Sequence, residues 1–230
     1  MIIHKNVIQA KFITRPNRFQ AYVSLDGVES LVHVPNTGRC KEILIPGSTV
    51  LLREERNPLR KTKYDLIGGY KNNRLINIDS QIPNKVVEEA LNNKKIHLLD
   101  EYCKVEREKT FGNSRFDFKL TDEVGQECYL EVKGVTLEQE GKTMFPDAPT
   151  ERGRKHLLEL VQVKREKKEA AVLFLIQMEN VKYFTTYDDM DKEFGKALRY
   201  AKKSGVYVLA YDCKVGENFI TLQNQIEIRL

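Results

Sequence analysis

The stretch RFDFKL at residues 115–120 is followed by CYLEVK at residues 128–133, and this pair of segments decides the fold of the second half of the chain. Each segment alternates apolar and polar residues, as strands do when successive side chains point to opposite faces of a sheet. The linker at residues 121–127 is short and polar and contains Gly125, which is typical of a hairpin connection. An antiparallel hairpin is therefore predicted.

The apolar side chains of this hairpin are expected to share one face and pack on one core. They are Phe116, Phe118 and Leu120 on the first strand and Cys128, Leu130 and Val132 on the second. The other face then brings Asp117, Glu131 and Lys133 together. An aspartate followed on the next strand by Glu-X-Lys resembles the core of PD-(D/E)XK nucleases. The simpler alternative is the solvated face of a half-exposed hairpin.

The resemblance to that core implies a role for each of the three residues. Asp117 and Glu131 would hold Mg²⁺ or Mn²⁺, because hard cations prefer oxygen ligands. Lys133 would orient or deprotonate the attacking water, or stabilise the charge that develops on the phosphate. The three residues are therefore the candidate catalytic centre.

Composition indicates a soluble chain with room for one large domain or two small ones. Its 230 residues are 41% hydrophobic and 31% charged, with a net charge of +5 that permits an anionic partner. No apolar run is long enough to cross a membrane, and the first residues lack a signal-peptide pattern. The four cysteines are scattered without a CxxC pair, which argues against zinc and disulfides and favours a reduced, cytoplasmic protein.

The first third of the chain has the pattern of a small barrel. Short β-type segments are separated by turn residues and no long helix interrupts them. The expected strands are residues 7–13, 20–25, 29–34, 49–54, 64–69 and 74–78. Because a closed barrel leaves no exposed edge strand, an OB-like barrel is predicted, with an SH3-like barrel as the alternative. We expect residues 1–82 to form this domain and residues 83–230 a second one.

Basic and aromatic residues of this barrel are candidates for nucleic-acid binding, although ordinary surface arginines are an equal alternative. They are Arg15, Arg18, Phe19, Tyr22 and Arg39. The loop that contains Asn36, Thr37 and Gly38 is a further candidate, since Asn and Gly tolerate the positive φ of an anion-binding nest. The alternative is a tight turn without a ligand, and such turns are far more common than phosphate sites.

Two helices are predicted to flank the hairpin in the sequence. The first covers residues 85–95, with Asn84 as its N-cap, Glu88 and Glu89 on or beside its outer face, and four buried residues. These are Val86, Val87, Ala90 and Leu91. A stretch expected to be irregular, residues 138–149, follows the hairpin.

The second helix begins at Thr150 and is predicted to reach residue 168. Its packed stripe is expected to contain Leu157, Leu158, Leu160 and Val161. On a helical wheel Arg152, Lys155 and His156 then lie away from that stripe. Because they stand near a helix N-terminus, they form a candidate phosphate site.

The last part of the chain supplies the centre of a sheet. Residues 170–177 (AAVLFLIQ) are uninterruptedly apolar, as in a strand covered on both faces. A helix at residues 191–203 ends before Gly205, and strands follow at residues 206–212 and 219–222. The order α–β–β–β–α–β, with an added α–β, is that of a PD-(D/E)XK nuclease-like domain. It predicts an α/β (α+β) mixed sheet flanked by helices.

Nearly the whole chain resembles the sugar fermentation stimulation protein A family. The segments that carry the resemblance are PNTGR (35–39), LIPG (44–47), RNP (56–58), PNKVVEEAL (83–91), SRFDF (114–118), YLEVKGVTL (129–137), MFPDAPTERGRKHLLEL (144–160) and VLFLIQ (172–177). The resemblance implies an OB-like domain joined to a PD-(D/E)XK-like domain, and DNA binding. It also implies a metal-site role for Glu89 and a substrate-binding role for Arg152, Arg154 and His156.

These observations lead to one leading hypothesis and one alternative. The first is a DNA-binding protein with a magnesium-dependent nuclease site at Asp117, Glu131 and Lys133, in which Arg152 and His156 hold the phosphate. The alternative is a non-catalytic DNA-binding regulator of sugar-metabolism genes that keeps the nuclease core as a scaffold. No motif indicates a small-molecule enzyme or a carbohydrate site.

Overall fold

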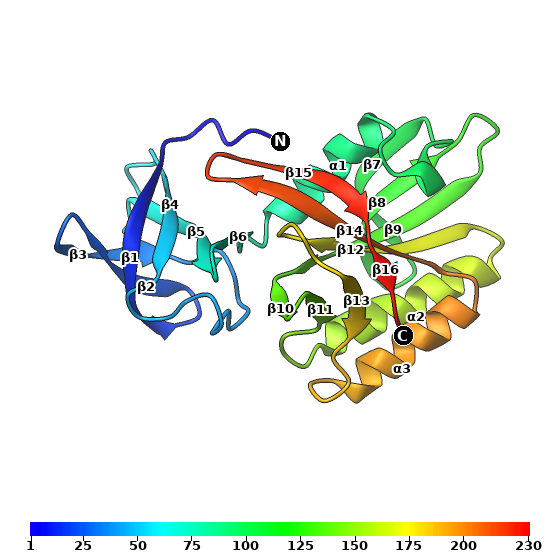
Figure 1. Ribbon diagram of the computed structural model, residues 1–230. Helices are drawn as coiled ribbons and strands as arrows, with labels where there is room; N and C mark the ends of the chain where they lie inside the picture. The colour runs from blue at the N-terminus through cyan, green and yellow to red at the C-terminus, as the bar shows by residue number, and fades with distance from the viewer.

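The first domain is a closed five-stranded barrel with one added strand. The computed structural model describes all residues 1–230 and places the barrel on the left of Figure 1. Its strands are β1 (Val7–Asn17), β2 (Gln20–Leu25), β3 (Val28–His33), β4 (Thr49–Glu54), β5 (Tyr64–Lys71) and β6 (Arg74–Asn77). They follow the order β3-β2-β1-β4-β5-β6, and a parallel β3–β5 pairing closes the barrel. The predicted OB-like barrel is confirmed.

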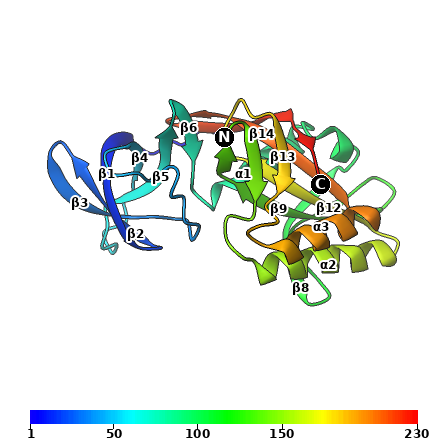
Figure 2. The same ribbon diagram turned by 60° about the horizontal axis from the view of Figure 1, so that its bottom comes forward.

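The second domain is a six-stranded mixed sheet covered by helices on both faces. Its elements include α1 (Ile82–Asn92), β7 (Lys104–Phe111), β8 (Ser114–Thr121), β9 (Glu127–Val135), α2 (Glu151–Arg165), β12 (Glu169–Ile176), α3 (Lys192–Lys203), β14 (Tyr207–Gly216) and β15 (Phe219–Gln225). A 3₁₀ turn, His97–Leu99, follows α1. The sheet order is β15-β14-β12-β9-β8-β7, with β12 parallel to both of its neighbours. Figures 1 and 2 show α1 on one face and α2 beside α3 on the other. This is the predicted PD-(D/E)XK-like architecture.

A second, smaller sheet was missed by the sequence analysis. Its four strands, in the order β10-β11-β13-β16, are β10 (Leu137–Gln139), β11 (Lys142–Phe145), β13 (Tyr183–Thr186) and β16 (Glu227–Ile228). Part of the stretch predicted to be irregular is therefore a hairpin. Its strands have at most four residues, too few for a repeating pattern, and β11 finds its parallel partner about forty residues later.

The predicted hairpin forms, but one of its apolar residues lies on the other face. Pairing runs from Thr121 opposite Glu127 to Phe118 opposite Leu130 and stops there. Phe118 packs on the α1 side, whereas Phe116 packs on the α2 side. The shared face predicted for Phe116 is thus wrong: β8 is no longer paired with β9 at this residue, and the Phe116 ring packs against Tyr129 and His156 instead.

Helix α1 begins before the predicted cap. Its N-cap is Gln81, and Pro83 lies within the first turn, where a missing N–H costs no intrahelical hydrogen bond. Asn84 is therefore inside the helix, not its cap. The helix ends at Asn92 and not at residue 95.

Side-chain and backbone contacts join the two domains. The Nε2 of Gln177, at the end of β12, donates to the backbone oxygen and Oδ1 of Asn77, at 3.0 Å each. Glu138 of β10 is buried and pairs with Lys71 of the barrel at 2.9 Å and with Arg74 at 3.0 Å. These contacts seat β6 and the end of β5 against the second domain.

None of the helices has the length and apolar character that a membrane crossing requires.

Candidate metal and nucleic-acid site

Glu131 is the centre of the candidate site. It stands on β9 with both faces of the sheet covered, and it is 3% exposed. Its Oε1 accepts a hydrogen bond from Lys133 Nζ at 2.6 Å and another from His156 Nδ1. Its Oε2 is buried and has no hydrogen-bond partner. The solvated-face alternative is therefore wrong for Glu131, since a charged group has been buried with one oxygen left free.

His156 was predicted to lie away from the packed stripe of its helix, but it is buried there and holds Glu131 in place. Thr150 caps α2 through the Gly153 N–H at 3.0 Å, which sets the start of the helix and its rotation. Gly153, His156 and Leu157 then share the buried face, as residues three or four apart do. Arg152 Nε approaches His156 Nε2 at 3.5 Å. An acceptor role for Nε2 assigns the proton to Nδ1, which donates it to Glu131.

The predicted stripe of α2 is also wrong at Leu158, which is 46% exposed. It lies next to Leu157 on the helix and therefore about 100° around it. The three other residues of the predicted stripe are buried, with Val163 in addition.

Asp117 lies next to Glu131 and is held by two donors. Its Oδ2 accepts from the Val132 backbone N–H at 2.8 Å, and its Oδ1 accepts from Asn84 Nδ2 at 2.7 Å. The carboxylate thus takes the place of the missing ladder partner of Val132, which explains why the hairpin pairing stops here. Asn84 was expected to cap a helix, and in the structure it instead positions a site residue.

The two carboxyl groups have pKa shifts of opposite sign. Burial, followed by the charge of Glu131, raises the pKa of Asp117. Burial also acts to raise the pKa of Glu131, but hydrogen bonding to His156 and the nearby Lys133 ammonium bring it below its ordinary value. Two neighbouring acids with opposite shifts are a common sign of a functional site.

Helix α1 does not bring Glu89 to this pair. Its carboxylate binds the amino group of Met1 and is 44% exposed. Five positions separate it from Asn84, which is about 140° around a helix. Glu88 lies closer to the face of Asn84, and it contacts Arg107 at 3.4 Å. No group of three or more His, Cys, Asp or Glu residues gathers as a ready-made metal cage.

The basic residues at the start of α2 differ in how freely they are exposed. Arg152 and Lys155 are exposed, and Lys155 Nζ donates to the Asn113 backbone oxygen at 3.0 Å. Arg154 is half-buried and lies 4.0 Å from Glu151. Arg152 is thus the cation of this turn that combines exposure with contact to the Glu131–His156 pair.

The barrel loop predicted to be an anion nest is folded around a cation instead. Arg15 donates to four backbone oxygens, those of Arg18, Asn36, Gly38 and Arg39, at distances between 2.6 and 3.0 Å. The Gly38 N–H is bound by Asn36 Oδ1 at 2.6 Å, and Asn36 Nδ2 donates to Ile78 O at 2.7 Å. The nest prediction is wrong, because the loop turns its carbonyl groups toward Arg15 and uses its amide inside the protein.

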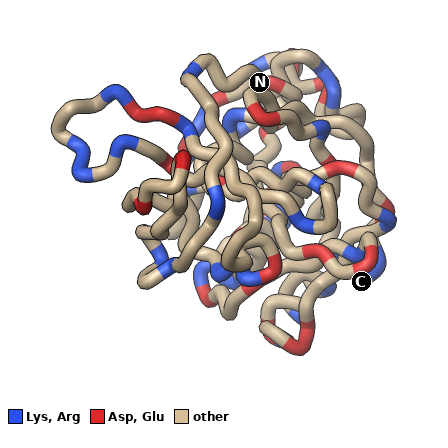
Figure 3. Tube along the Cα trace, turned by 60° about the vertical axis from the view of Figure 1, so that its left-hand side comes forward, with Lys and Arg blue, Asp and Glu red and all other residues tan.

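The other predicted barrel residues remain available to a partner. Arg18, Thr37 and Arg39 are exposed, and the side chains of Arg18 and Arg39 make no hydrogen bond or ion pair within the protein. In the view of Figure 3, Lys and Arg are interspersed with Asp and Glu along the trace. An interface for an anion therefore has to be sought in particular cations rather than in a uniformly basic face.

An OB barrel followed by a PD-(D/E)XK-like domain with a buried acid pair defines the class of this protein. Two family models match it, the SfsA N-terminal OB domain over residues 13–78 and the sugar fermentation stimulation protein RE domain over residues 81–219. The chain belongs to the sugar fermentation stimulation protein family, as the sequence resemblance predicted.

Relatives cover the chain from end to end. A sugar fermentation stimulation protein homolog of Clostridium kluyveri is 69% identical over 230 residues, which is 100% of both chains. The homolog of Clostridium tetani is 66% identical over the same length. Among solved structures, that of Pyrococcus furiosus SfsA in complex with Ca²⁺ superposes with a TM-score of 0.90 at 26% identity, again covering 100% of both chains.

Proposed function

We propose that this protein binds DNA and hydrolyses its phosphodiester bonds with Mg²⁺ or Mn²⁺. The observation that carries the proposal is the free Oε2 of Glu131, buried next to Asp117 and Lys133. A buried anionic oxygen without a donor is unfavourable in the protein alone, and a bound cation removes that cost.

The residues present fit a hard divalent cation. Asp117 and Glu131 would hold it, and Mg²⁺ is commonly bound by one or two carboxylates, with water and substrate phosphate completing its shell. That the Pyrococcus furiosus relative was solved with Ca²⁺ supports an oxygen-liganded cation in this family. When bound, such a cation acts as a Lewis acid that polarises the phosphate and acidifies water.

The protein's own groups would orient the reactants. Lys133 is 15% exposed and tied to Glu131, so its ammonium has a fixed position from which to orient water and stabilise negative charge on the phosphate. His156 keeps Oε1 of Glu131 occupied, which leaves Oε2 as the ligand. Asn84 and the Val132 N–H hold Asp117 in the same way.

Exposed cations on both domains would bind the DNA backbone. Arg152 and Lys155 stand at the start of α2, and Arg18 and Arg39 stand on the barrel. Four such contacts predict a slope of about −3 for log affinity against log salt on single-stranded DNA. The cysteines form no disulfide, in keeping with the cytoplasm, where we place this activity.

The experiment is incubation of the purified protein with labelled single- and double-stranded DNA in Mg²⁺, Mn²⁺ or EDTA. Cleavage in either metal and its absence in EDTA is the expected result. Salt-dependent binding without cleavage in any metal would instead support the non-catalytic regulator, and absence of binding to any nucleic acid would refute both.

A further inference from the structure

A groove on the barrel combines an apolar floor with cations that no acid neutralises. The groove has a volume of about 390 Å³, and no Asp or Glu lines it. Its apolar surface comes from Phe12, Leu44 and Pro46, and its cations include Arg18, Arg39 and Lys41. The Lys41 side chain is exposed and, like those of Arg18 and Arg39, makes no hydrogen bond or ion pair in the protein. We call this hollow the barrel groove.

An exposed aromatic ring stands beside the barrel groove. Phe19 directly follows Arg18 in the turn after β1 and is 53% exposed. Its backbone oxygen accepts from the Val34 N–H at 2.8 Å, which holds the turn against the loop that forms the groove. Aromatic faces next to cations bind the bases of single strands, because each base offers a flat ring and each phosphate a charge.

The barrel groove continues toward the candidate catalytic strand. Thr37 and Gly38 line the groove and also a second hollow of about 150 Å³ between the domains. Gly134, the residue after Lys133, lines that second hollow, which we call the interdomain pocket. One base fits such a space, whereas a duplex does not.

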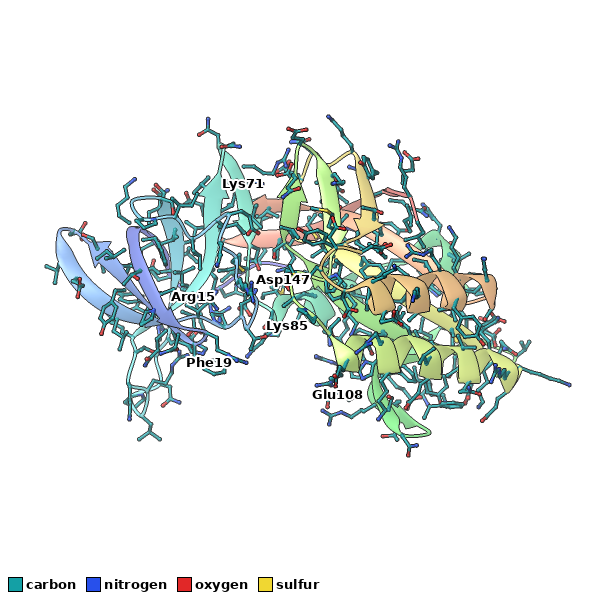
Figure 4. The ribbon with its side chains drawn as sticks, turned by 90° about the horizontal axis from the view of Figure 1, so that it is seen from below. Arg15, Phe19, Lys71, Lys85, Glu108 and Asp147 are labelled. Atoms are coloured by element: carbon teal, nitrogen blue, oxygen red, sulfur yellow. The ribbon has the colours of Figure 1, made fainter.

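Asp147 is the charged residue that lines the interdomain pocket. Figure 4 places Asp147 at the edge of the second domain, facing the barrel that carries Arg15 and Phe19. The carboxylate packs closely on the loop, since a Cβ on Gly38 would lie 2.3 Å from Asp147 Oδ2. It accepts no hydrogen bond and forms no ion pair within the protein. A free carboxylate repels phosphate and accepts hydrogen bonds from the donor groups of a base.

Taken with the proposed function, on which this step depends, we propose that the barrel groove and the interdomain pocket bind an unpaired DNA strand with a guanine at Asp147. Guanine is the DNA base whose Watson–Crick edge offers two adjacent N–H donors to one carboxylate. That edge is accessible only when the base is unpaired. The substrate is accordingly a single strand or an unpaired tail, with its backbone along Arg18, Arg39 and Lys41.

The strand preference is tested by fluorescence anisotropy with the full-length protein in EDTA, so that binding is measured without cleavage. The probes are a labelled single strand and the blunt duplex of the same sequence. Arg39→Ala/Lys41→Ala should weaken single-strand binding at least tenfold and duplex binding less than threefold. Its log–log salt slope for the single strand should be shallower by about 1.4, since each phosphate contact on a single strand contributes about 0.7.

The matched control removes two cations elsewhere. Lys202→Ala/Lys203→Ala changes the net charge equally at the exposed end of α3 and should leave both affinities within twofold. Equal loss for single strand and duplex in the groove variant, or tighter wild-type binding to the duplex, would refute the strand preference. Cleavage of duplex DNA would in that case leave the nuclease proposal standing. Absence of binding to either probe would refute both.

The role of Asp147 is tested with thymine oligonucleotides in which every third base is guanine, cytosine or adenine. Wild-type protein should bind the guanine series several-fold more tightly than the other two. Asp147→Ala should abolish this difference while keeping the affinity for the cytosine and adenine series. Because the Asp147 side chain makes no hydrogen bond or ion pair within the protein, the variant should fold as the wild type does. Equal affinity of the wild type for all three series would overturn the base assignment.

Discussion

Two buried carboxylates, one in each domain, are built from the same kinds of group. Asp65 on β5 is 4% exposed and Glu131 on β9 is 3% exposed. His33 Nδ1 lies 2.8 Å from Asp65 Oδ1, and Arg53 Nη2 lies 2.9 Å from Asp65 Oδ2. Around Glu131 the corresponding groups are His156 and Lys133. Each site is thus a carboxylate with one histidine and at least one strong cation.

The two sites differ in whether both oxygens of the carboxylate have a hydrogen-bond donor. Arg60 contacts both oxygens of Asp65 in addition, so that carboxylate is fully bound, and Asp65 pairs with His33 at the β3–β5 contact that closes the barrel. Glu131 keeps Oε2 without a donor. A complete network of this kind stabilises a fold, whereas a buried oxygen without a donor calls for an explanation, of which a bound ion is one. The comparison therefore separates an acid whose hydrogen bonds are complete, Asp65, from the acid that we propose to be functional, Glu131.

The largest expected effect is on catalysis. Glu131→Gln and Asp117→Asn each remove one negative charge from the proposed cation ligands, and we expect cleavage to fall roughly a thousandfold. The measurement is the single-turnover rate on labelled DNA in Mg²⁺. Asp65→Asn, assayed at the same concentration of folded protein, is the control and should keep the wild-type rate.

Two results would contradict this assignment. A wild-type rate in Asp117→Asn would place the activity at another site or in a contaminant. An equal loss in Asp65→Asn would remove the functional distinction between the two carboxylates.

The sequence predicted what depends on local pattern. The barrel strands, the hairpin, the central strand at residues 170–177 and the C-terminal helix could all be found, because alternation, turn residues and apolar runs act over a few neighbours. The identity of Asp117, Glu131 and Lys133 as a group also followed from alternation on two adjacent strands.

What could not be predicted depends on the rotation of each helix about its axis and on contacts with residues far along the chain. His156 is polar and was expected outside, but the rotation of α2 puts it on the buried face, where it meets Glu131. Arg15 resembles any surface arginine, and only the folded loop shows that it binds four carbonyl oxygens. Glu89 had the right residue type, and the geometry of α1 turns it toward Met1. No sequence signal distinguishes these cases, although the spacing Gly153–His156–Leu157 is compatible with one buried face.

The second expected effect is on stability, and it should be larger for Asp65. Asp65→Ala leaves Arg60 and His33 without their shared acceptor and should lower the free energy of unfolding by about 3 kcal/mol. Glu131→Gln should cost less, since one of its oxygens has no hydrogen bond to lose. Urea unfolding in EDTA measures both. The reverse order would show that the free oxygen of Glu131 is not a cost in the metal-free protein.

The third expected effect is a pH dependence that belongs to Asp65. Burial acts to raise its pKa, but hydrogen bonds from Arg60, His33 and Arg53 lower it to about 2. Because the folded pKa lies below the unfolded one, this stabilisation is present above about pH 4 and is lost as the pH falls toward 2. It amounts to about 2 kcal/mol. Urea midpoints between these pH values should fall more steeply for the wild type than for Asp65→Asn, and parallel curves would contradict the assignment.

The smallest expected effect is a gain in stability rather than a loss. The pKa of Asp117 is raised by burial and by Glu131, so the folded state carries a charge at neutral pH that the unfolded chain accommodates more easily. Asp117→Asn removes that charge. Its new amide can still bond Asn84, whose own amide group can turn over, and its oxygen can accept from Val132. In EDTA we expect a gain below about 1 kcal/mol, or roughly 2 °C in Tm.

Addition of Mg²⁺ should then reverse the order of the two proteins. The wild type gains stability because the cation binds only the folded state, while Asp117→Asn has lost a ligand and should gain little. Thermal melts of both proteins with and without Mg²⁺ provide the measurement, with Asp65→Asn as a variant that should gain as much from Mg²⁺ as the wild type. A lower Tm for Asp117→Asn in EDTA would mean that the acid pair is not a source of repulsion. The free oxygen of Glu131 would then need an explanation other than the binding of a cation.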